Sequence, residues 1–414
     1  MNPTLTSLVP GDLARQLRRA ERRKRVFAIS LTLPLLIFLL VTFLVPIGAL
    51  LVRAVENPEV ASTLSRTVKV LAHWDRASSP PDTAYAALIK DMADISEQAD
   101  AGALARRLNS EISGARSLVM KTFRASPPAE VITPAQAREY LLEQDPRWAE
   151  LGYWQAIAKN GSRWTPDYLL ASVDLQRDIQ GNIVQVGPNA AAFSKILMRT
   201  FEISAIVTLS CLLLGYPLAY WLSTLSARKA NMLMILVLVP FWTSVLVRSA
   251  AWIVLLQTNG LVNSSLIGLG VMDEPLPLLF NRLGVIIAMV HILLPFMILP
   301  LYSVMKSVPS TYLRAAVSLG SSPLAAFFRV YVPQTYPGVG AGGLLVFILS
   351  IGYYVTPALL GGADDQMLSY YIAQYTNVTV NWGMACALGA VLLAATLVLY
   401  ALYRRVVKSE LSLG

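Results

Sequence analysis

Charged residues are scarce in this sequence of 414 residues: they make up only 14% of it, whereas 55% of the residues are hydrophobic. A soluble protein of average composition carries about a quarter charged residues. The shortage of charge excludes an ordinary soluble globular protein. It indicates a membrane protein that carries one soluble insertion.

Cysteine and histidine are nearly absent, with two residues of each. Cys211 and Cys386 fall within apolar segments, so we interpret them as small packing residues rather than as a disulfide or a metal pair. His73 and His291 have no neighbours in the sequence with which to form a metal cluster or a convincing catalytic group. We therefore predict no catalytic residue, no metal site and no cofactor, and we expect that the chain is not an enzyme.

A phosphate-binding G-x-x-x-x-G-K-[ST] loop is also missing, so the chain cannot bind ATP by that mechanism. If the chain takes part in a process that ATP drives, another polypeptide must bind the ATP. The net charge of +9 could suggest nucleic acid, but the positive residues are grouped at the ends of apolar segments. The positive-inside rule explains that placement better, and we predict no binding of nucleic acid.

Long uncharged runs, in contrast, are abundant. The first, 27–52, follows a basic tail at 1–26 and exceeds the length needed to cross a hydrocarbon core of roughly 30 Å. A cleaved signal peptide is the alternative, but the run is too long for one, and we favour a retained anchor. A membrane core at 194–408 and a tail at 409–414 follow, and the further predicted spans are 203–227, 230–256, 283–305, 338–360 and 382–403. We expect an all-α membrane protein with six transmembrane helices.

Residues 53–193 have a soluble character, with charge runs and patterns typical of amphipathic helices. Thr133-Pro134 is a plausible helix start. About 140 residues are enough to bury a core, so we expect a small helical insertion between the first two spans. We interpret its tryptophans as core residues rather than as ligand stackers; they are Trp74, Trp148, Trp154 and Trp164.

The distribution of positive charge predicts the orientation. Fifteen Lys and Arg residues lie in the basic tail, the loop at 228–229, the loop at 306–337 and the C-terminus, whereas the short loops opposite hold only Arg282. The rich side is expected to be cytoplasmic. This places both termini and the loop 306–337 in the cytoplasm and the insertion in the periplasm, and it brings the basic tail against anionic membrane lipid.

The loop at 313–333 has the signals of two short helices joined at an elbow. Gly320 can supply a left-handed helix stop, and Ser322-Pro323 supplies an N-cap followed by proline at the first helical position. An ordinary polar connection with a glycine turn is the alternative. The residues that define the pattern are Leu313, Arg314, Ala315, Ala316, Gly320, Ser322, Pro323, Val330, Val332 and Pro333.

This pattern resembles the "EAA" loop of binding-protein-dependent ABC importer permeases, with Arg314 in place of the usual acid. Three further stretches, 240–248, 294–302 and 352–362, resemble the spermidine/putrescine-type branch of that family. The resemblance covers the first span and roughly Thr200 to the end. It implies a six-helix permease in the bacterial inner membrane whose loop 313–333 couples to ABC ATPase subunits. It also implies a second permease subunit, which forms a heterodimer with this chain, and a periplasmic solute-binding protein.

Several residues in the spans are candidates for the translocation pathway or its gate. Prolines at membrane depth free carbonyls that need protein or a watery cavity around them, although they also serve packing alone. Arg248 can snorkel to the interface, guide a carboxylate or brace an outer gate. Gly338-x-x-x-Gly342 suits either a subunit interface or a bland turn. The pathway candidates are Trp242, Thr243, Arg248, Pro295, Tyr353, Tyr354, Thr356 and Pro357.

Two other functional classes compete with an ABC permease. A sensor needs a cytoplasmic output domain, which the sequence does not offer. An ion-coupled secondary transporter is expected to carry intramembrane acids, and the predicted spans hold none. The solute stays open between a polyamine, an omega-amino acid and an opine-like compound. Acids that are common in the resembling branch are replaced here by Tyr353 and Ala358.

Overall fold

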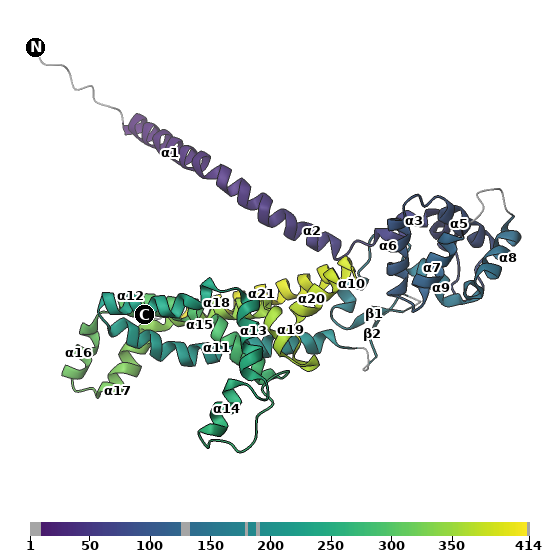
Figure 1. The fold of residues 1–414 in the computed structure, drawn as a ribbon. Coiled ribbons are helices and arrows are strands. Elements are labelled where there is room, and N and C mark those ends of the chain that lie inside the picture. The colour runs from purple at the N-terminus through teal and green to yellow at the C-terminus, as the bar shows by residue number, and fades with distance from the viewer. Residues whose placement is uncertain (1–9, 126–132, 179–180, 188–190, 412–414) are drawn as a thin grey trace, which may run out of the picture. The chain divides into compact units, whose positions relative to one another are not determined.

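The computed structural model describes residues 10–125, 133–178, 181–187 and 191–411 (Figure 1). The start of the predicted basic tail 1–26 and the end of the predicted tail 409–414 lie outside these residues. The chain divides into two units, residues 1–53 and residues 54–414.

The first unit is one helical segment, made of α1 (Pro10–Leu39), the π-helical turn η1 (Leu40–Leu44) and α2 (Val45–Arg53). The π turn comes just before Pro46, which has no N–H to give to an α-helical hydrogen bond. The segment from Ala20 to Arg53 is long and apolar enough to cross a membrane.

The insertion opens the second unit and is mainly helical, as expected. Thr133 and Gln136 form a capping box at the start of α8, with Pro134 in the first turn, which confirms the predicted helix start. The helices are α3 (Pro58–Thr63), α4 (Ser65–Leu71), α5 (Asp82–Ala93), α6 (Gln98–Asn109), α7 (Ala115–Arg124), α8 (Pro134–Gln144), η2 (Pro146–Ala149), α9 (Leu151–Lys159) and α10 (Asp167–Ala171).

Tryptophan side chains stand at the centre of the insertion. Trp148 and Trp154 are fully buried with ring centroids 5.5 Å apart, and Trp154 Nε1 donates to the Trp148 carbonyl at 2.8 Å. Trp74 packs against the same cluster. The prediction of a core role is therefore confirmed for these three. It is wrong for Trp164, which is 56% exposed.

A short hairpin that the sequence did not predict joins the insertion to the next helix. Strands β1 (Leu175–Arg177) and β2 (Ile183–Gln185) pair antiparallel. The carboxylate of Asp174 accepts hydrogen bonds from the backbone N–H groups of Ala192, Phe193 and Ser194 at 2.8–3.0 Å. Carboxylates satisfy the free donors of a helix start, which explains why α11 begins at Phe193.

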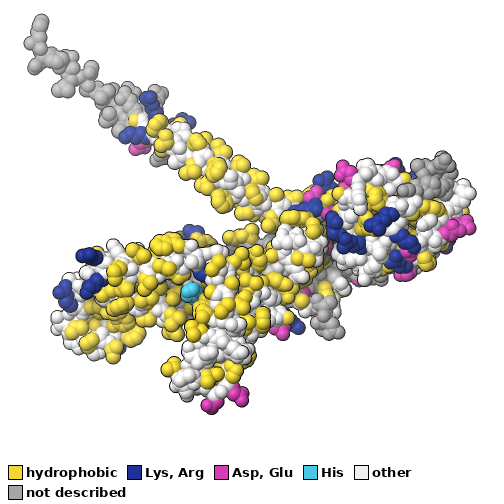
Figure 2. Space-filling model, in the orientation of Figure 1, with side chains coloured by type: hydrophobic (Ala, Val, Ile, Leu, Met, Phe, Trp, Pro, Cys, Tyr) yellow, Lys and Arg dark blue, Asp and Glu magenta, His cyan; other side chains and the backbone are white. Residues whose placement is uncertain are grey.

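The remaining residues form a body of long apolar helices, and Figure 2 shows hydrophobic side chains over most of its visible face. Its elements are α11 (Phe193–Thr224), α12 (Ala227–Leu238), η3 (Val239–Trp242), α13 (Val245–Leu256), α14 (Leu261–Gly268), α15 (Arg282–Ser307), α16 (Ser310–Ser318), α17 (Pro323–Ala326), η4 (Phe327–Tyr331), α18 (Val332–Gly352), α19 (Val355–Leu360), η5 (Ala363–Asp365), α20 (Leu368–Asn377) and α21 (Trp382–Leu411).

Helix α15 is the centre of this body, because both α11 and α18 pack along it. Glycines allow the close approach. A Cβ on Gly342 would lie 2.9 Å from Met297 Sδ, and one on Gly338 would lie 3.2 Å from the Pro300 carbonyl oxygen. The suggested role of Gly338 and Gly342 in a subunit interface is therefore replaced by packing within the chain.

Among the described residues, six helical segments are long and apolar enough to cross a membrane, which agrees with the expected number of spans. The bounds differ most from the prediction in two segments. The third segment is Val245–Gly268 instead of 230–256, because α12 ends near Pro240 and a new helix begins after Ser244. The fifth is Pro323–Gly352 instead of 338–360, because the helix runs past Arg329 and stops at Tyr353. The others are Ala20–Arg53, Phe193–Thr224, Arg282–Ser307 and Trp382–Arg405.

Candidate functional site

The elbow between α16 and α17 has the local structure that its sequence predicts. Gly320 adopts the left-handed conformation with φ +93°, and its N–H donates to the Val317 carbonyl at 3.0 Å. Ser321 N–H reaches back to the Ala316 carbonyl at 3.1 Å. These two bonds form a Schellman motif, which satisfies carbonyls that the end of α16 leaves free. The turn is thus specified by one residue that can adopt a positive φ.

Helix α17 begins directly after this turn. Ser322 Oγ accepts a hydrogen bond from Ala325 N–H at 3.3 Å, and Pro323 occupies the first turn. The chain then passes through the π-helical turn η4 into α18. The expected pair of short helices is therefore confirmed as local structure.

The tip of the elbow presents apolar side chains. Leu319 is 88% exposed and Leu324 is 72% exposed, and Phe328 follows them on η4. Three exposed apolar side chains are thus gathered on one loop. The predicted residues Arg314, Ala315, Ser322, Pro323 and Pro333 are also exposed, whereas Leu313, Ala316, Val330 and Val332 are half-buried.

The base of the elbow is fixed to the helical body. Tyr220 of α11 contacts the rings of Phe327 and Tyr331 at 5.2 and 5.3 Å between centroids. Lys306 Nζ, in the last turn of α15, donates to the carbonyls of Ser223 and Leu225 at 3.0 and 2.9 Å. The base of the elbow therefore packs on α11, and Lys306 ties the end of α15 to the end of α11.

A second region surrounds the break before α13. Phe241 packs edge-on against Phe296 of α15 at 4.7 Å, and Thr243 Oγ1 donates to the Pro240 carbonyl at 2.8 Å. Ser244 caps α13 by accepting from Leu246 N–H. The predicted pathway residue Trp242 projects from the body and is 77% exposed.

Arg248 lies one turn into α13 and is half-buried. Its Nε is buried and finds no hydrogen-bond partner among the described residues. Arg248 is within electrostatic range of His291 on α15 and of Tyr353 at the end of α18. A buried guanidinium donor without a partner carries an energetic cost.

Two hydrogen bonds connect α13 to its neighbours beside Arg248. Ser249 Oγ and Thr356 Oγ1 of α19 are 3.1 Å apart, and both side chains are buried. Trp252 Nε1 donates to His291 Nδ1 at 3.2 Å. Sequence reasoning missed Ser249 and Trp252. For Trp252 the available signal was its spacing of four residues from Arg248, because positions i and i+4 share a helix face. The position of Ser249 next to Arg248 gave no such signal.

The stretch 352–362 follows the fifth span and contains a second break. Helix α18 ends at Gly352, and α19 holds Thr356 and Pro357 buried. Tyr353 is half-buried and its carbonyl accepts from Ser369 Oγ at 2.7 Å, whereas Tyr354 is 44% exposed. The structure thus groups Arg248, Tyr353 and Thr356. It places Pro295 in the buried face of α15, and Trp242 and Thr243 at the other break.

Ion pairs hold the ends of the helices on the insertion side. Arg282 Nη1 lies 2.8 Å from Glu202 Oε1, and Arg282 Nε lies 3.3 Å from Asp365 Oδ1. Arg199 Nη1 donates to the Gln366 carbonyl at 3.3 Å. The described residues contain no group of three or more His, Cys, Asp and Glu side chains that could hold a metal ion.

Known proteins resemble the part of the chain that follows the insertion. Residues 191–410 match the model of the family "Binding-protein-dependent transport system inner membrane component". The chain is 37% identical over 208 residues to the spermidine/putrescine transport system permease protein PotB of Haemophilus influenzae, which covers 50% of this chain and 73% of that protein. It is 38% identical over 196 residues to PotB of Escherichia coli, covering 47% and 71%.

Among solved structures, a bacterial alginate ABC transporter in complex with an alginate pentasaccharide-bound periplasmic protein is similar, with 16% identity and a TM-score of 0.42. The match covers 51% of this chain and 76% of that one.

Proposed function

Since this chain belongs to the binding-protein-dependent transport system inner membrane components and is a permease subunit of an ABC importer, we propose that separate ATPase subunits drive it through the α16–α17 elbow. The observation that carries this proposal is the elbow itself. It combines a rigid turn at Gly320, an apolar tip with Leu319 88% exposed, and an aromatic base on α11. A surface of this kind needs a partner.

In the proposed cycle, closure of the ATPase subunits moves the elbow and rocks the helices between inward-open and outward-open states. The chain itself supplies no catalytic group; it is the translocation subunit. A second permease subunit completes the pathway in a heterodimer, and a periplasmic solute-binding protein delivers the solute. The exposed apolar faces of α12 and α13 are available to that subunit or to lipid.

The proposed orientation puts both termini and the elbow in the cytoplasm and the insertion in the periplasm. Lys and Arg side chains gather at the end of the helices that carries α12 and α16, as Figure 2 shows. Acidic residues Asp273 and Glu274 follow α14. Such a division of charge supports this orientation under the positive-inside rule.

We propose that the solute is a small polar molecule, of the polyamine, omega-amino acid or opine-like class. The names of the PotB relatives support a polyamine. Tyr353 and Ala358, which replace acids of that branch, and the unpartnered Nε of Arg248 support a solute that carries a carboxylate. Calorimetry of candidate solutes with the cognate binding protein decides between the classes.

The test is reconstitution of the chain with its second permease and ATPase subunits in liposomes. Solute uptake is expected to need ATP inside the liposome and the binding protein outside. Uptake by the purified chain alone, or uptake driven by an ion gradient without ATP, would favour an ion-coupled secondary transporter and contradict the proposal. A cysteine at Leu319 is expected to cross-link to the ATPase subunit.

A further inference from the structure

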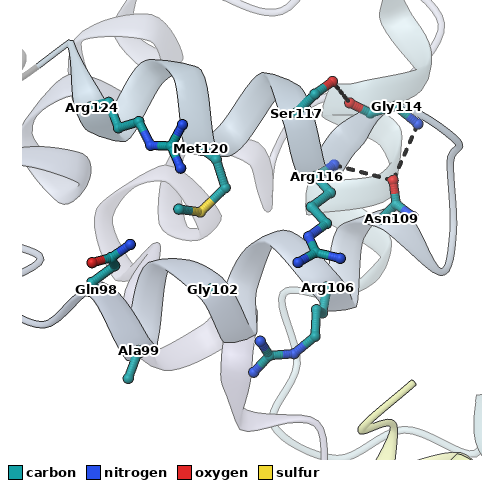
Figure 3. A pocket seen from close by; sticks show the side chains of 10 residues that line it. All are labelled: Gln98, Ala99, Gly102, Arg106, Asn109, Gly114, Arg116, Ser117, Met120 and Arg124. Carbon is teal, nitrogen blue, oxygen red and sulfur yellow. Dashed lines mark hydrogen bonds between the residues drawn. The ribbon is translucent and has the colours of Figure 1, made fainter. Parts of the chain in front are cut away.

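Helices α6 and α7 of the insertion enclose a groove of about 700 Å³. Figure 3 shows its lining side chains: Arg116 and Arg124 on α7 point toward α6, and Arg106 on α6 belongs to the same lining. Met120 reaches into the middle of the groove. The lining contains three arginines and no carboxylate. The groove is therefore basic along its length.

These three arginines differ from most others in the insertion in their ion pairing. Arg66, Arg107, Arg147 and Arg177 each form an ion pair with an Asp or Glu of the insertion. The guanidinium groups that line the groove make no ion pair with a described residue. Residues 54–192 contain 17 Asp and Glu against 14 Lys and Arg, so acids are not in short supply. The lack of acidic side chains in the groove is therefore specific to this site and does not follow from the composition of the insertion.

Local structure holds the groove open. Asn109 Oδ1 accepts the backbone N–H groups of Gly114 and Arg116 at 3.2 Å each, which sets the turn between the two helices. Gly102 leaves space on the face of α6, because a Cβ there would lie 3.4 Å from Arg106 Nη1. The guanidinium of Arg106 thus lies back along its own helix, beside Gly102.

The dimensions indicate what the groove can hold. Its lining on α6 runs from Gln98 to Asn109, which is ~16 Å along a helix. The arginines stand at separate points of this length rather than around one position, and their side chains are exposed. A single small anion would engage only one end. An extended or helical protein segment with carboxylates at intervals matches the spacing and the charge.

We propose that this groove, defined by Arg106, Arg116 and Arg124, docks an acidic strip on the surface of the solute-binding protein. This inference rests on the proposed function, which places that protein on the side of the insertion. The groove steers the binding protein electrostatically and fixes its orientation over the helices. Asp and Glu carboxylates of the binding protein then pair with the groove arginines, as Asp and Glu of the insertion itself pair with its other arginines.

The experiment uses the assembled importer in nanodiscs and measures the affinity of its own binding protein by biolayer interferometry. The double variant Arg106→Glu/Arg116→Glu is expected to raise Kd about tenfold or more at ~0.05 M salt, and far less at ~0.3 M salt, because exposed charges are screened. Arg106→Gln/Arg116→Gln, which retains hydrogen-bonding capacity, is expected to raise Kd about threefold.

A matched control reverses two other exposed cations of the insertion. Lys69→Glu/Lys90→Glu makes the same change in net charge on α4 and α5, outside the groove, and is expected to change Kd less than about twofold. Neither pair of side chains forms an ion pair or a hydrogen bond with another described side chain. Thermal unfolding should therefore be unchanged in both.

Two results would overturn the docking groove. One is an equal loss of affinity in the groove and control variants, and another is an unchanged Kd in the groove variants. In the second case, weaker binding of the groove variants to phosphatidylglycerol vesicles would assign the groove to lipid. In both cases the unaltered importer still binds its binding protein, so the proposed function stands. Solute uptake by the unaltered importer without any binding protein would instead contradict the proposed function.

Discussion

The ring of Tyr168 lies directly against the backbone of Gly383, so closely that a Cβ on the glycine would overlap the ring. Tyr168 belongs to α10 of the insertion, and Gly383 lies in the first turn of α21. The guanidinium of Arg107 lies over the same ring, 4.9 Å from its centroid. Arg107 in turn bonds Asn57 Oδ1 at 2.8 Å. One tyrosine therefore connects the buried polar network of the insertion to a membrane helix.

Gly383→Ala is expected to disrupt this contact and to lower the free energy of unfolding by about 1–3 kcal/mol, because overpacking forces side chains or backbone to shift. The measurement is thermal unfolding of the detergent-purified chain. Adding Tyr168→Ala should recover part of the loss, since the two residues are coupled. Gly268→Ala is the control, because no atom lies within 4 Å of its Cβ position. Equal effects of the two glycine variants would contradict the contact.

The acid sensitivity of the insertion provides another prediction. Hydrogen bonds from Arg147 hold the pKa of Asp145 well below its usual range. An unfolded aspartate has a pKa of about 4. Because the folded pKa is lower, the stabilisation is complete above pH ~4 and is lost as the pH falls toward the folded pKa. Asp145→Asn is expected to lower stability at neutral pH by about 2 kcal/mol and to reduce the loss of stability in acid.

Tryptophan fluorescence of the full chain between pH 7 and pH 2 measures this effect, since Trp148 follows Asp145 closely in the sequence. Asp82→Asn is the matched control. Its ion pair with Arg138 is exposed, so the change should cost less than about 1 kcal/mol. An acid transition that is identical in the parent chain and in Asp145→Asn would show that another group controls it.

Features that depend on neighbouring residues were predictable from the sequence. The left-handed Gly320 and the capping Ser322 follow from turn chemistry within a few residues. The six spans follow from long uncharged runs, and the family resemblance read from four stretches is confirmed. These signals are local, so one sequence is enough to read them.

Features that depend on distant residues were not predictable. Gly338 and Gly342 fit α15, and only the fold shows that their partners are Pro300 and Met297. Proline content indicated a weak point near 240, but whether the helix kinks or restarts depends on the packing of Phe241 against Phe296. The groove between α6 and α7 likewise requires the turn that Asn109 sets.

Substitution of Arg248 separates snorkelling from solute recognition. Arg248→Lys retains a positive charge on a long side chain, so simple snorkelling predicts nearly normal transport. If the planar guanidinium of Arg248 instead binds a carboxylate of the solute through two hydrogen bonds, uptake by the lysine variant should fall at least about tenfold. An ammonium group cannot replace a guanidinium at such a bidentate site. We expect the second result. Uptake by the reconstituted importer measures it, and normal uptake by the lysine variant would assign Arg248 to the membrane interface.

The elbow makes the sharpest prediction about coupling. Gly320 has φ +93° and no atom within 4 Å of its Cβ position, so any effect of substitution comes from the backbone rather than from a clash. Gly320→Val should cost about 1–2 kcal/mol in the left-handed conformation and loosen the Schellman turn. ATP hydrolysis is then expected to continue while solute uptake falls several-fold. Gly320→Asn, which tolerates this conformation, should retain uptake.

The chain offers a matched control for this variant. Gly270 also has a positive φ, +69°, and no atom within 4 Å of its Cβ position, but it lies beyond α14, far from the elbow in the sequence. Gly270→Val therefore imposes the same backbone strain without touching the proposed coupling surface. Hydrolysis and uptake should stay coupled in it. Full uptake in Gly320→Val would contradict the coupling role of the elbow. Equal uncoupling in both valine variants would contradict it too, because the backbone strain would then act through general stability.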